Sequence, residues 1–462
     1  MAETHRLVYL VDADELCEYE KGVYRRGVEK ALARHAELIE SSAKNQFINE
    51  VIGKTKRRAR PVKVSDFDAE PFLVNVRNGV LDLRTGRLTN HSPAMLFLNQ
   101  MDVEYDPTAR AREFERFMES ILPDPADRLR VIDHFASCLV RMPVKKDLMC
   151  VGETDSGKST LLNLVRLFLG PENVSSTALQ ELEMDRFAAA DLFGKLANIH
   201  PDIDDQELRR TSKFKTTSGS DQIRAQRKYG HPFFFVPYAK HLYSANRIPA
   251  TKDESEAFFN RWNVIFFPMR FVDRPESYPG EHFSKRDPRI LNRLLTPEEK
   301  SGILNVLAAR ARWVATAGEI PNSQSIDEVR DLWLYHSDFI ENFLRDNIEL
   351  NAEGRITKAD PYHLYVGYCA TRKITPKSKQ EFNARIEKRG ARESVGKVDG
   401  RSVKLWIGVR LKENDAANPV ESVEPERPST KSTEKRLLLV SELPDVSLLA
   451  AAEMISKAEW SS

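Results

Sequence analysis

The sequence predicts an α/β protein with a largely parallel sheet, an N-terminal mixed module and a C-terminal winged-helix domain. A short apolar run at 148–151 precedes a glycine-rich loop and an amphipathic helix. Beyond residue 320, helical segments lead into the alternating run 395–407, where Asp399-Gly400 is a strong hairpin signal. Between these regions, helical segments alternate with apolar strand-like runs, as in a parallel sheet: 196–199, 233–236, 241–245 and 264–267.

The glycine-rich loop is a complete phosphate-binding pattern, G-x-x-x-x-G-K-[ST], between a strand and a helix. Backbone N–H groups and the helix N-terminus would face a polyphosphate, Lys158 would reach its β- and γ-phosphates, and the Ser159 hydroxyl would ligate Mg²⁺. A glycine-containing surface turn is the alternative. We therefore expect ATP and Mg²⁺ as cofactors. The candidate nucleotide-binding residues are Gly152, Glu153, Thr154, Asp155, Ser156, Gly157, Lys158, Ser159 and Thr160.

Composition limits where other ligands can bind. The chain has 462 residues, which suits about three domains. Its 70 basic and 69 acidic residues nearly cancel, so any nucleic-acid surface must be a local patch. The four cysteines lie far apart without a C-x-x-C pair, which argues against a zinc site and fits a reducing compartment. With no long apolar stretch or signal pattern, we expect a soluble, intracellular protein and no membrane partner.

We expect five segments along the chain. They are an N-terminal mixed module at 1–105, a helical module at 106–142, the P-loop core at 143–315, the winged-helix domain at 320–412, and a disordered linker with a C-terminal tail at 413–462.

Three local features belong to this organisation. Residues 80–88 predict a hairpin with a Thr85-Gly86 turn. The basic run 54–60 is interpreted as a solvated linker, with phosphate contact as the alternative. Apolar residues from Val329 to Leu344 predict one long amphipathic helix.

Acidic residues follow the strand at 196–199. A carboxylate at a strand end there would hold hydrated Mg²⁺ and polarise the attacking water. Asp202, Asp204 and Asp205 are alternatives for this role, and Asp202 is favoured because it is nearest the strand end. The competing interpretation is that these residues cap the next helix.

Residues 209–247 are a locally basic segment, with nine Lys or Arg and one acid, Asp221. Its centre, 223–233, predicts two strands joined by a turn, a finger that offers charge to phosphates and an aromatic ring to a base. The alternative is a solvated edge hairpin with Tyr229 packed on the core. The DNA-binding candidates of the finger and the preceding segment are Lys215, Arg227, Lys228 and Tyr229.

Two further polar residues are candidates at the nucleotide. Asn246 ends a buried-looking strand and would orient water against the γ-phosphate. Arg261 precedes the strand 264–267 and would complete a neighbouring subunit's site as an arginine finger, although a structural ion pair is the alternative. The catalytic candidates are Lys158, Asp202, Asp204, Asn246 and Arg261.

The C-terminal region is also basic. Residues 371–412 carry thirteen Lys or Arg and four acids. Arg385, Lys388 and Arg389 share one side of an expected recognition helix and are further DNA-binding candidates, while a solvated basic face is the alternative.

In this order and spacing, the motifs resemble those of superfamily 3 helicases of the phage, plasmid and poxvirus primase-helicase type, over about residues 75–412. The most specific segments are 215–223, 227–229 and 244–249. The resemblance implies an AAA+-like core that forms a ring, usually hexameric, and translocates on single-stranded DNA with ATP. Lys158 and Ser159 match the family's ATP and Mg²⁺ positions, Asp202 its acidic motif, Asn246 its sensor and Arg261 its finger.

The resemblance also implies partners: single-stranded and forked DNA, other copies of the chain, and a separate primase or polymerase. It further implies a cytoplasmic location, nucleoid-associated or in an infected or plasmid-bearing cell. Primer synthesis by this chain alone is not expected. The rival function is an ATP-dependent replication initiator or helicase loader without processive unwinding. A small-molecule kinase would not account for residues 209–247.

Overall fold

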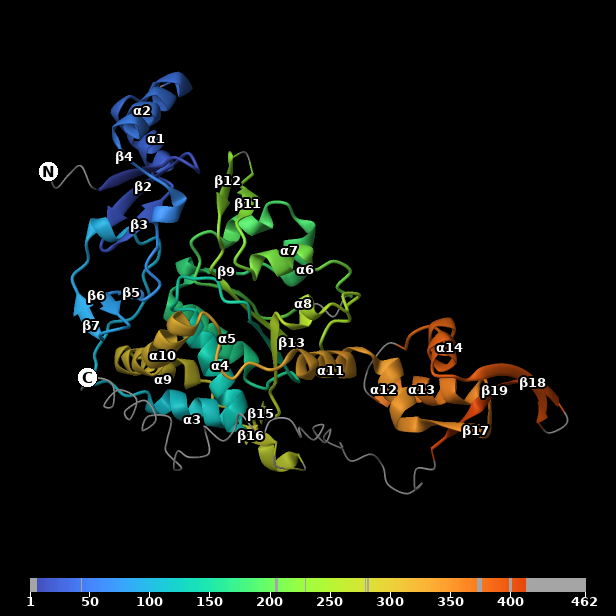
Figure 1. Ribbon diagram of the computed structural model, residues 1–462. Coiled ribbons are helices and arrows are strands. Elements are labelled where there is room, and N and C mark those ends of the chain that lie inside the picture. Colours follow the sequence, from blue (N-terminus) through green and yellow to red (C-terminus); the bar gives the residue numbers. More distant parts are fainter. Residues whose placement is uncertain are drawn as a thin grey trace. The chain divides into compact units, whose positions relative to one another are not determined.

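The computed structural model describes residues 6–42, 44–203, 207–228, 230–278, 280, 282–371, 376–398 and 401–412 (Figure 1). The described chain divides into two compact units between Arg330 and Asp331.

The first unit begins with a mixed sheet in the order β3-β2-β1-β4. Strand β4 runs parallel to β1, whereas the other neighbours are antiparallel. Two helices connect β3 to β4 (Figure 1). The elements are β1 (Leu7–Leu10), β2 (Glu15–Glu20), β3 (Val23–Arg26), α1 (Val28–Ile39), α2 (Asn45–Arg58) and β4 (Arg60–Val62).

The basic run 54–60 is part of this sheet module. Its residues form the last turn of α2 and the start of β4, so the interpretation as a solvated linker is wrong. The physical reason lies in the flanking residues, because Ile48 and Val62 are buried and anchor the two elements. The cations themselves stay at the surface.

The expected hairpin at 80–88 is confirmed within a small antiparallel sheet. Its strands are β5 (Leu73–Val76), β6 (Gly79–Asp82) and β7 (Arg87–Thr89). Gly86 has φ 67°, a left-handed conformation that glycine adopts easily in a turn.

A buried polar cluster joins these N-terminal strands to the rest of the unit. The Arg141 guanidinium lies 3.3 Å from the Asp68 carboxylate and donates to Asn99 Oδ1. The Tyr238 hydroxyl donates to the same carboxylate at 2.8 Å. Such a buried charge is tolerated because each group has a partner.

Two helices that the apolar spacing predicted are confirmed, α3 (Arg112–Ile121) and α4 (Pro125–Ser137). Asp124 caps α4, its carboxylate accepting from the Ala126 N–H at 2.8 Å. Both helices contact α10 (Pro297–Ala317), which follows α9 (Ile290–Leu294).

The centre of the unit is a five-stranded sheet in the order β14-β8-β13-β10-β9. All of its neighbours pair in parallel, which confirms the predicted parallel sheet. Helix α4 contacts β8 and β14, and α5 contacts β13 (Figure 1). The elements are β8 (Asp147–Val151), α5 (Lys158–Leu169), β9 (Val174–Ser175), β10 (Ala197–His200), β13 (Lys240–Ala245) and β14 (Trp262–Phe266).

The basic segment contains the antiparallel hairpin β11 (Ile223–Gln226) and β12 (Pro232–Phe235), as predicted for the finger. The run at 233–236 therefore belongs mainly to this hairpin rather than to the parallel sheet. The unit's other elements are α6 (Leu179–Met184), α7 (Ser212–Thr217), α8 (Glu256–Phe259), and the parallel pair β15 (Arg270–Val272) and β16 (Phe283–Lys285).

The single long helix expected at 329–344 is wrong. The structure has two helices, α11 (Ile326–Ser337) and α12 (Phe339–Asn347). Asp338 breaks the pattern because its carboxylate accepts from the Glu341 N–H at 3.1 Å and caps α12.

The second unit continues with a three-stranded antiparallel sheet in the order β17-β19-β18. The predicted C-terminal hairpin is confirmed, and its Asp399-Gly400 turn lies outside the described residues, as does the tail 413–462. Phe343, Tyr365, Phe382 and Trp406 are buried at the centre. The elements are β17 (Ile348–Thr357), α13 (Asp360–Thr371), α14 (Lys379–Lys388), β18 (Arg392–Val398) and β19 (Arg401–Leu411).

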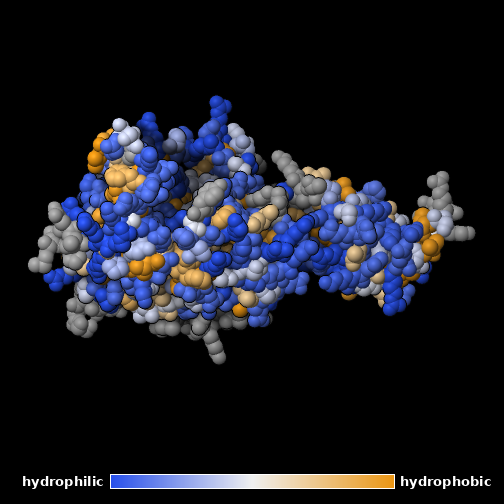
Figure 2. Space-filling model, turned by 90° about the horizontal axis from the view of Figure 1, so that it is seen from above, coloured by the Kyte–Doolittle hydropathy of each residue, from blue (hydrophilic) through white to orange (hydrophobic). Residues whose placement is uncertain are grey.

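The face drawn in Figure 2 is mostly hydrophilic, with hydrophobic residues in small separate groups. None of the helices in the described ranges is both long and apolar enough to cross a bilayer.

We expect Arg310→Ala to destabilise the first unit by about 3 kcal/mol or more. Arg310 donates to both oxygens of the fully buried Asp133 at 2.6 and 2.9 Å, so its removal leaves a buried carboxyl without its cation. Urea unfolding measures the change. Arg116→Ala, which removes an exposed ion pair with Glu113, is the control and should cost less than about 1 kcal/mol. Equal costs for the two variants would contradict the role of the buried pair.

Candidate functional site

The loop between β8 and α5 requires glycine at two positions. A Cβ at Gly152 would lie 2.7 Å from the Phe267 carbonyl oxygen, and one at Gly157 would lie 2.6 Å from Ile121 Cγ2. Gly157 also has φ 92°, and Asp155 has φ 66°. The sequence pattern therefore reflects close packing of the loop, with its N–H groups leading into the first turn of α5.

Lys158 turns its ammonium group into this loop. Its Nζ donates to the carbonyl oxygens of Gly152 (2.6 Å) and Glu153 (2.8 Å), and to Ser156 Oγ (3.1 Å). Burial lowers the pKa of Lys158, while the nearby charges of Glu153, Asp202 and Asp155 act in the opposite direction. The cation is thus preorganised among groups that an anionic ligand can replace.

The ends of neighbouring strands bring two further candidates to the same edge of the sheet. Asn246 directly follows β13, and its Oδ1 lies 3.5 Å from Lys158 Nζ. Asp202 follows β10, where the Ile203 N–H donates to the Ser244 carbonyl at 2.8 Å and fastens this segment to β13. Asp204 lies outside the described residues.

The remaining loop candidates are accessible. Glu153, Thr154 and Asp155 are exposed, and so is Ser159 in the first turn of α5. Thr160 follows it and is half-buried. Among the described residues, no three His, Cys, Asp or Glu side chains gather as metal ligands.

Sequence reasoning missed Arg286, which contacts the loop from the segment after β16. Its guanidinium lies 2.9 Å from the Asp155 carboxylate, and the Phe271 N–H donates to the Asp155 carbonyl at 2.9 Å. No motif marks Arg286, because the contact depends on how β15 and β16 return to the loop.

Arg261 lies at the opposite edge of the sheet from Lys158, because it precedes β14 and β14 runs parallel to β8. Its guanidinium donates to the Lys215 carbonyl at 3.2 and 3.4 Å. The structure therefore does not bring Arg261 together with the phosphate-binding loop of its own chain.

The cations of the basic segment are in two different states. Arg227 pairs with Glu15 at 3.0 Å and lies over the Phe233 ring, and Lys215 pairs with Asp253 at 2.7 Å. Arg224 and Lys228 are exposed, whereas Arg227 and Lys215 are half-buried. Tyr229 lies outside the described residues.

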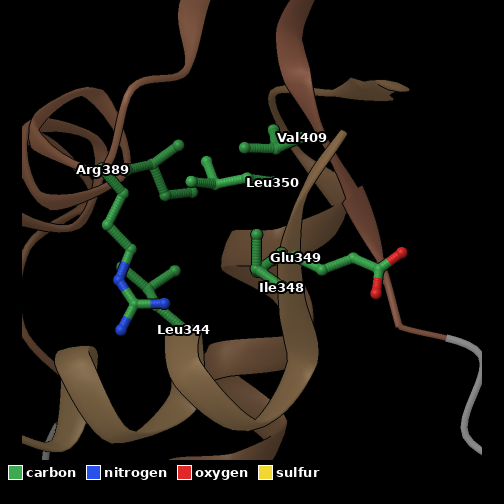
Figure 3. A pocket seen from close by; sticks show the side chains of 7 residues that line it. Leu344, Ile348, Glu349, Leu350, Arg389 and Val409 are labelled. Carbon is green, nitrogen blue, oxygen red and sulfur yellow. The ribbon is translucent and has the colours of Figure 1, made fainter. Parts of the chain in front are cut away.

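The C-terminal candidates on α14 are divided in the same way. Arg385 pairs with Asp338 at 2.9 Å and Arg389 pairs with Glu341, whereas Lys388 is exposed. A hollow of about 160 Å³ lies beside Arg389. The Glu349 carboxylate points away from it (Figure 3). Its other lining residues, apart from Arg389, are Leu344, Ile348, Leu350, Ile386 and Val409, so it offers little for polar chemistry.

A buried carboxyl group, Asp147, lies at the start of β8, on the edge where Arg261 is found. Its Oδ1 accepts from the His241 N–H at 3.0 Å, its Oδ2 accepts from the Ser218 hydroxyl, and its own N–H donates to the Arg261 carbonyl at 2.7 Å. Burial raises the pKa of Asp147 to about 7, while the hydrogen bonds and the nearby cations of Arg261 and Lys240 act to lower it.

Two family models match parts of the chain. The model described as D5 N terminal like matches residues 11–123, and that of a family of unknown function, DUF5906, matches residues 150–261. The second match includes the phosphate-binding loop, Asn246 and Arg261.

The chain is also similar to "Putative helicase 121R" of Invertebrate iridescent virus 3, with 23% identity over 241 residues. The match covers 48% of this chain and 25% of that protein, so the chain spans about a quarter of the relative's length. Among solved structures, two apo structures of the NrS-1 C terminal region are similar, each with 11% identity and 87% and 95% coverage of the two chains. Their TM-scores are 0.46 and 0.45, both below 0.5.

We expect Asp147→Asn to remove part of the pH dependence of stability. The pKa of Asp147 in the folded chain, about 7, lies above its ordinary value of 3.8, so between these values the folded chain holds a proton that the unfolded chain has released. The contribution of this carboxyl to the free energy of unfolding therefore falls as the pH rises from about 4 to about 7. Above pH 7 this contribution is constant.

Urea unfolding of both chains between about pH 4 and pH 8 measures this difference. The titratable groups that face Asp147 do not change the sign of this pH dependence. Burial lowers the pKa of His241 to about 3 and that of Lys240 to about 8, and both groups are present in both chains. If the wild-type chain and the variant lose stability equally over this interval, Asp147 does not titrate as stated.

Proposed function

We propose that this chain is an ATP hydrolase that couples nucleotide turnover to movement on single-stranded DNA, as a helicase in the replication of a phage, plasmid or other mobile element. The observation that carries the proposal is the proximity of two side chains at the phosphate-binding loop, where Lys158 Nζ lies 3.5 Å from Asn246 Oδ1. The matches to the D5 N terminal like family and to a viral protein named as a helicase support a role in replication.

The residues of the loop fit ATP and Mg²⁺. The two glycines let the loop pack closely against Phe267 and Ile121. In this conformation a polyphosphate would meet backbone N–H groups at the N-terminus of α5. Ser159 and Asp202 would hold Mg²⁺, which keeps most of its waters and needs few protein ligands. When bound, Mg²⁺ neutralises charge on the phosphates.

Three side chains would have different roles in hydrolysis: Lys158, Asn246 and Asp202. The Lys158 ammonium would exchange the Gly152 and Glu153 carbonyls for phosphate oxygens and stabilise the charge that develops on the transferring group. The Asn246 amide would orient the attacking water, and Asp202 would accept its proton.

Arg261 would act on the site of a neighbouring copy. Because it lies at the far edge of its own sheet, a finger role requires another chain to bring it to the phosphates. We therefore propose a homo-oligomeric ring, as a hexamer, in which the ATP sites lie between subunits and the core is AAA+-like.

The DNA would contact the basic hairpin and the second unit. Exposed Arg224 and Lys228 offer charge to phosphates without reading sequence, which suits a motor. The second unit's order of helix, strand, two helices and hairpin supports a winged-helix domain, in which Lys388 is an exposed cation on α14. A separate primase or polymerase would supply primer synthesis.

A strand-displacement assay on a forked duplex, with and without ATP, tests the proposal as a whole. ATP-dependent displacement is expected. ATP hydrolysis with DNA binding but without displacement would instead indicate an initiator or loader.

We expect Lys158→Ala to lower ATP turnover by about 100-fold or more, because the variant loses its charge contact with the phosphates. Phosphate release measures turnover, and circular dichroism verifies that the chain is folded. Lys145→Ala, which removes an exposed lysine just before β8, is the control and should retain normal turnover. Normal turnover in Lys158→Ala would exclude the assigned site.

We expect a mixture of Arg261→Ala and Lys158→Ala chains to recover part of the ATPase activity that each variant lacks alone. In a mixed ring, some interfaces combine an intact loop from one chain with an intact Arg261 from the next. Phosphate release is measured across mixing ratios, with mixed assembly verified by pull-down of differently tagged chains. If mixed rings form and remain inactive at every ratio, Arg261 does not act in trans.

A further inference from the structure

The N-terminal sheet module contains a hollow of about 400 Å³ between α2, β1 and β4. We call it the α2–β4 hollow. Its size lies within the range of roughly 300–1,000 Å³ that is usual for ligand pockets. Gly53 contributes no side chain and so leaves space within it. The lining residues are Tyr9, Val11, Gly53, Lys56, Arg57, Ala59 and Pro61.

Tyr9 gives this hollow an aromatic ring with a fixed orientation. Its hydroxyl donates to Asp14 Oδ1 at 2.9 Å, and Lys56 Nζ lies 2.7 Å from the same oxygen. The same ammonium group lies over one face of the ring, 5.7 Å from its centre. Val11 is 42% exposed and contributes an apolar wall. A rigid, half-buried ring beside apolar side chains is a suitable surface for stacking an unpaired base.

Cations follow the hollow along the chain. Arg57 and Arg58 end α2, Arg60 begins β4, and all three are exposed. Within the described ranges, none of the three forms an ion pair, whereas Arg227, Lys215, Arg385 and Arg389 are all paired. Interaction with the helix dipole accounts for cations in the last turn of α2, but not for Arg60 in the strand.

We propose that the α2–β4 hollow binds single-stranded nucleic acid, with a base stacked on Tyr9 and the adjoining phosphates bound by Arg57, Arg58 and Arg60. A single strand fits better than a duplex because only an unpaired base exposes its face to the ring. No residue of the hairpin or of the nucleotide loop lines this hollow. The site would give the N-terminal module a function of its own, because it would hold the strand independently of ATP.

The test measures binding of a fluorescein-labelled oligothymidylate of about 20 nucleotides to the full chain by anisotropy. No ATP is present, and the salt concentration is varied. We expect the Arg57→Ala, Arg58→Ala double variant to bind about tenfold more weakly. Its salt slope should fall by about 1.4, since each lost phosphate contact on a single strand contributes about 0.7. The control is Lys30→Ala with Arg34→Ala, which removes two exposed cations from α1, a helix that does not line the hollow.

Tyr9 provides a second pair of variants. Tyr9→Leu should weaken binding about tenfold because it removes the stacking surface, whereas Tyr9→Phe keeps the ring and should bind normally. A blunt duplex of the same length should bind more weakly than the single strand and should not respond to Tyr9→Leu. Polyglutamate should displace the oligonucleotide poorly, because it lacks a base.

Photo-crosslinking of the unaltered chain to an oligonucleotide that contains 4-thiothymidine keeps the test decisive even where a variant fails to fold. We expect crosslinked peptides from residues 6–63. Each of three results would overturn the proposal. They are crosslinks only within 209–247, unchanged binding by both the arginine variant and the Tyr9→Leu variant, and equal competition by polyglutamate. Because the assay contains no ATP, loss of the proposed ATPase function would leave this result unaffected.

Discussion

The parallel pairing of β8 with both β13 and β14 is the constraint on which the site depends. Parallel strands end at one edge of a sheet, so the segments after β8, β10 and β13 meet there and bring Lys158 close to Asn246. The same pairing places Asp147 and Arg261 at the other edge. Five residues of strand β8 separate the two edges by about 16 Å, at about 3.3 Å per residue. A single arginine side chain does not span this distance, so Arg261 does not reach the loop of its own chain, and the proposed finger role would need a second chain.

The net charge of the chain is near zero, but its basic residues differ in whether they have an acidic partner. Some guanidinium groups have carboxylate partners within the fold, as Arg227 has Glu15 and Arg389 has Glu341. An anionic ligand must compete with these partners, which reduces the affinity that such a cation can contribute. Arg57 and Arg58 are exposed and form no ion pair with another described residue, so they carry no such cost. Counting basic residues in a segment therefore overestimates its capacity for nucleic acid.

Local patterns in the sequence predicted the elements that depend on local physics. The strand, loop and helix around Lys158, the parallel sheet, the hairpin predicted at 223–233 and the two helices α3 and α4 of the helical module are confirmed. The long helix at 329–344 is wrong because one capping residue, Asp338, outweighs a continuous apolar pattern. The linker at 54–60 is wrong because the pairing of β4 with β1 joins residues about 50 positions apart.

Contacts between distant residues also explain what the sequence did not show at the site. Arg286 reaches Asp155 from 131 positions away, and Glu15 reaches Arg227 from 212 positions away. Neither pair has a spacing that a motif records, since both depend on tertiary packing. The positions of Lys158 and Asn246 were predictable because each follows a strand of one parallel sheet, which converts sequence order into spatial proximity.

The two edges of the sheet differ in how their charges are satisfied. At the amino edge, Lys240 Nζ donates to the carbonyl oxygens of Val140, Met142 and Tyr238 at 2.7–2.9 Å. Lys146 Nζ donates to those of Trp262 and Gln324 at 3.1 and 2.9 Å. Burial lowers the pKa of each lysine to about 8, and removing any of these acceptors would leave a buried cation incompletely bonded.

At the carboxyl edge, the loop carbonyls that accept from Lys158 lie beside exposed residues, so a ligand can replace them. The amino edge therefore resists rearrangement while the carboxyl edge permits it. A ligand bound at the loop would therefore rearrange one edge of the sheet, while the backbone that carries Arg261 stays fixed at the other.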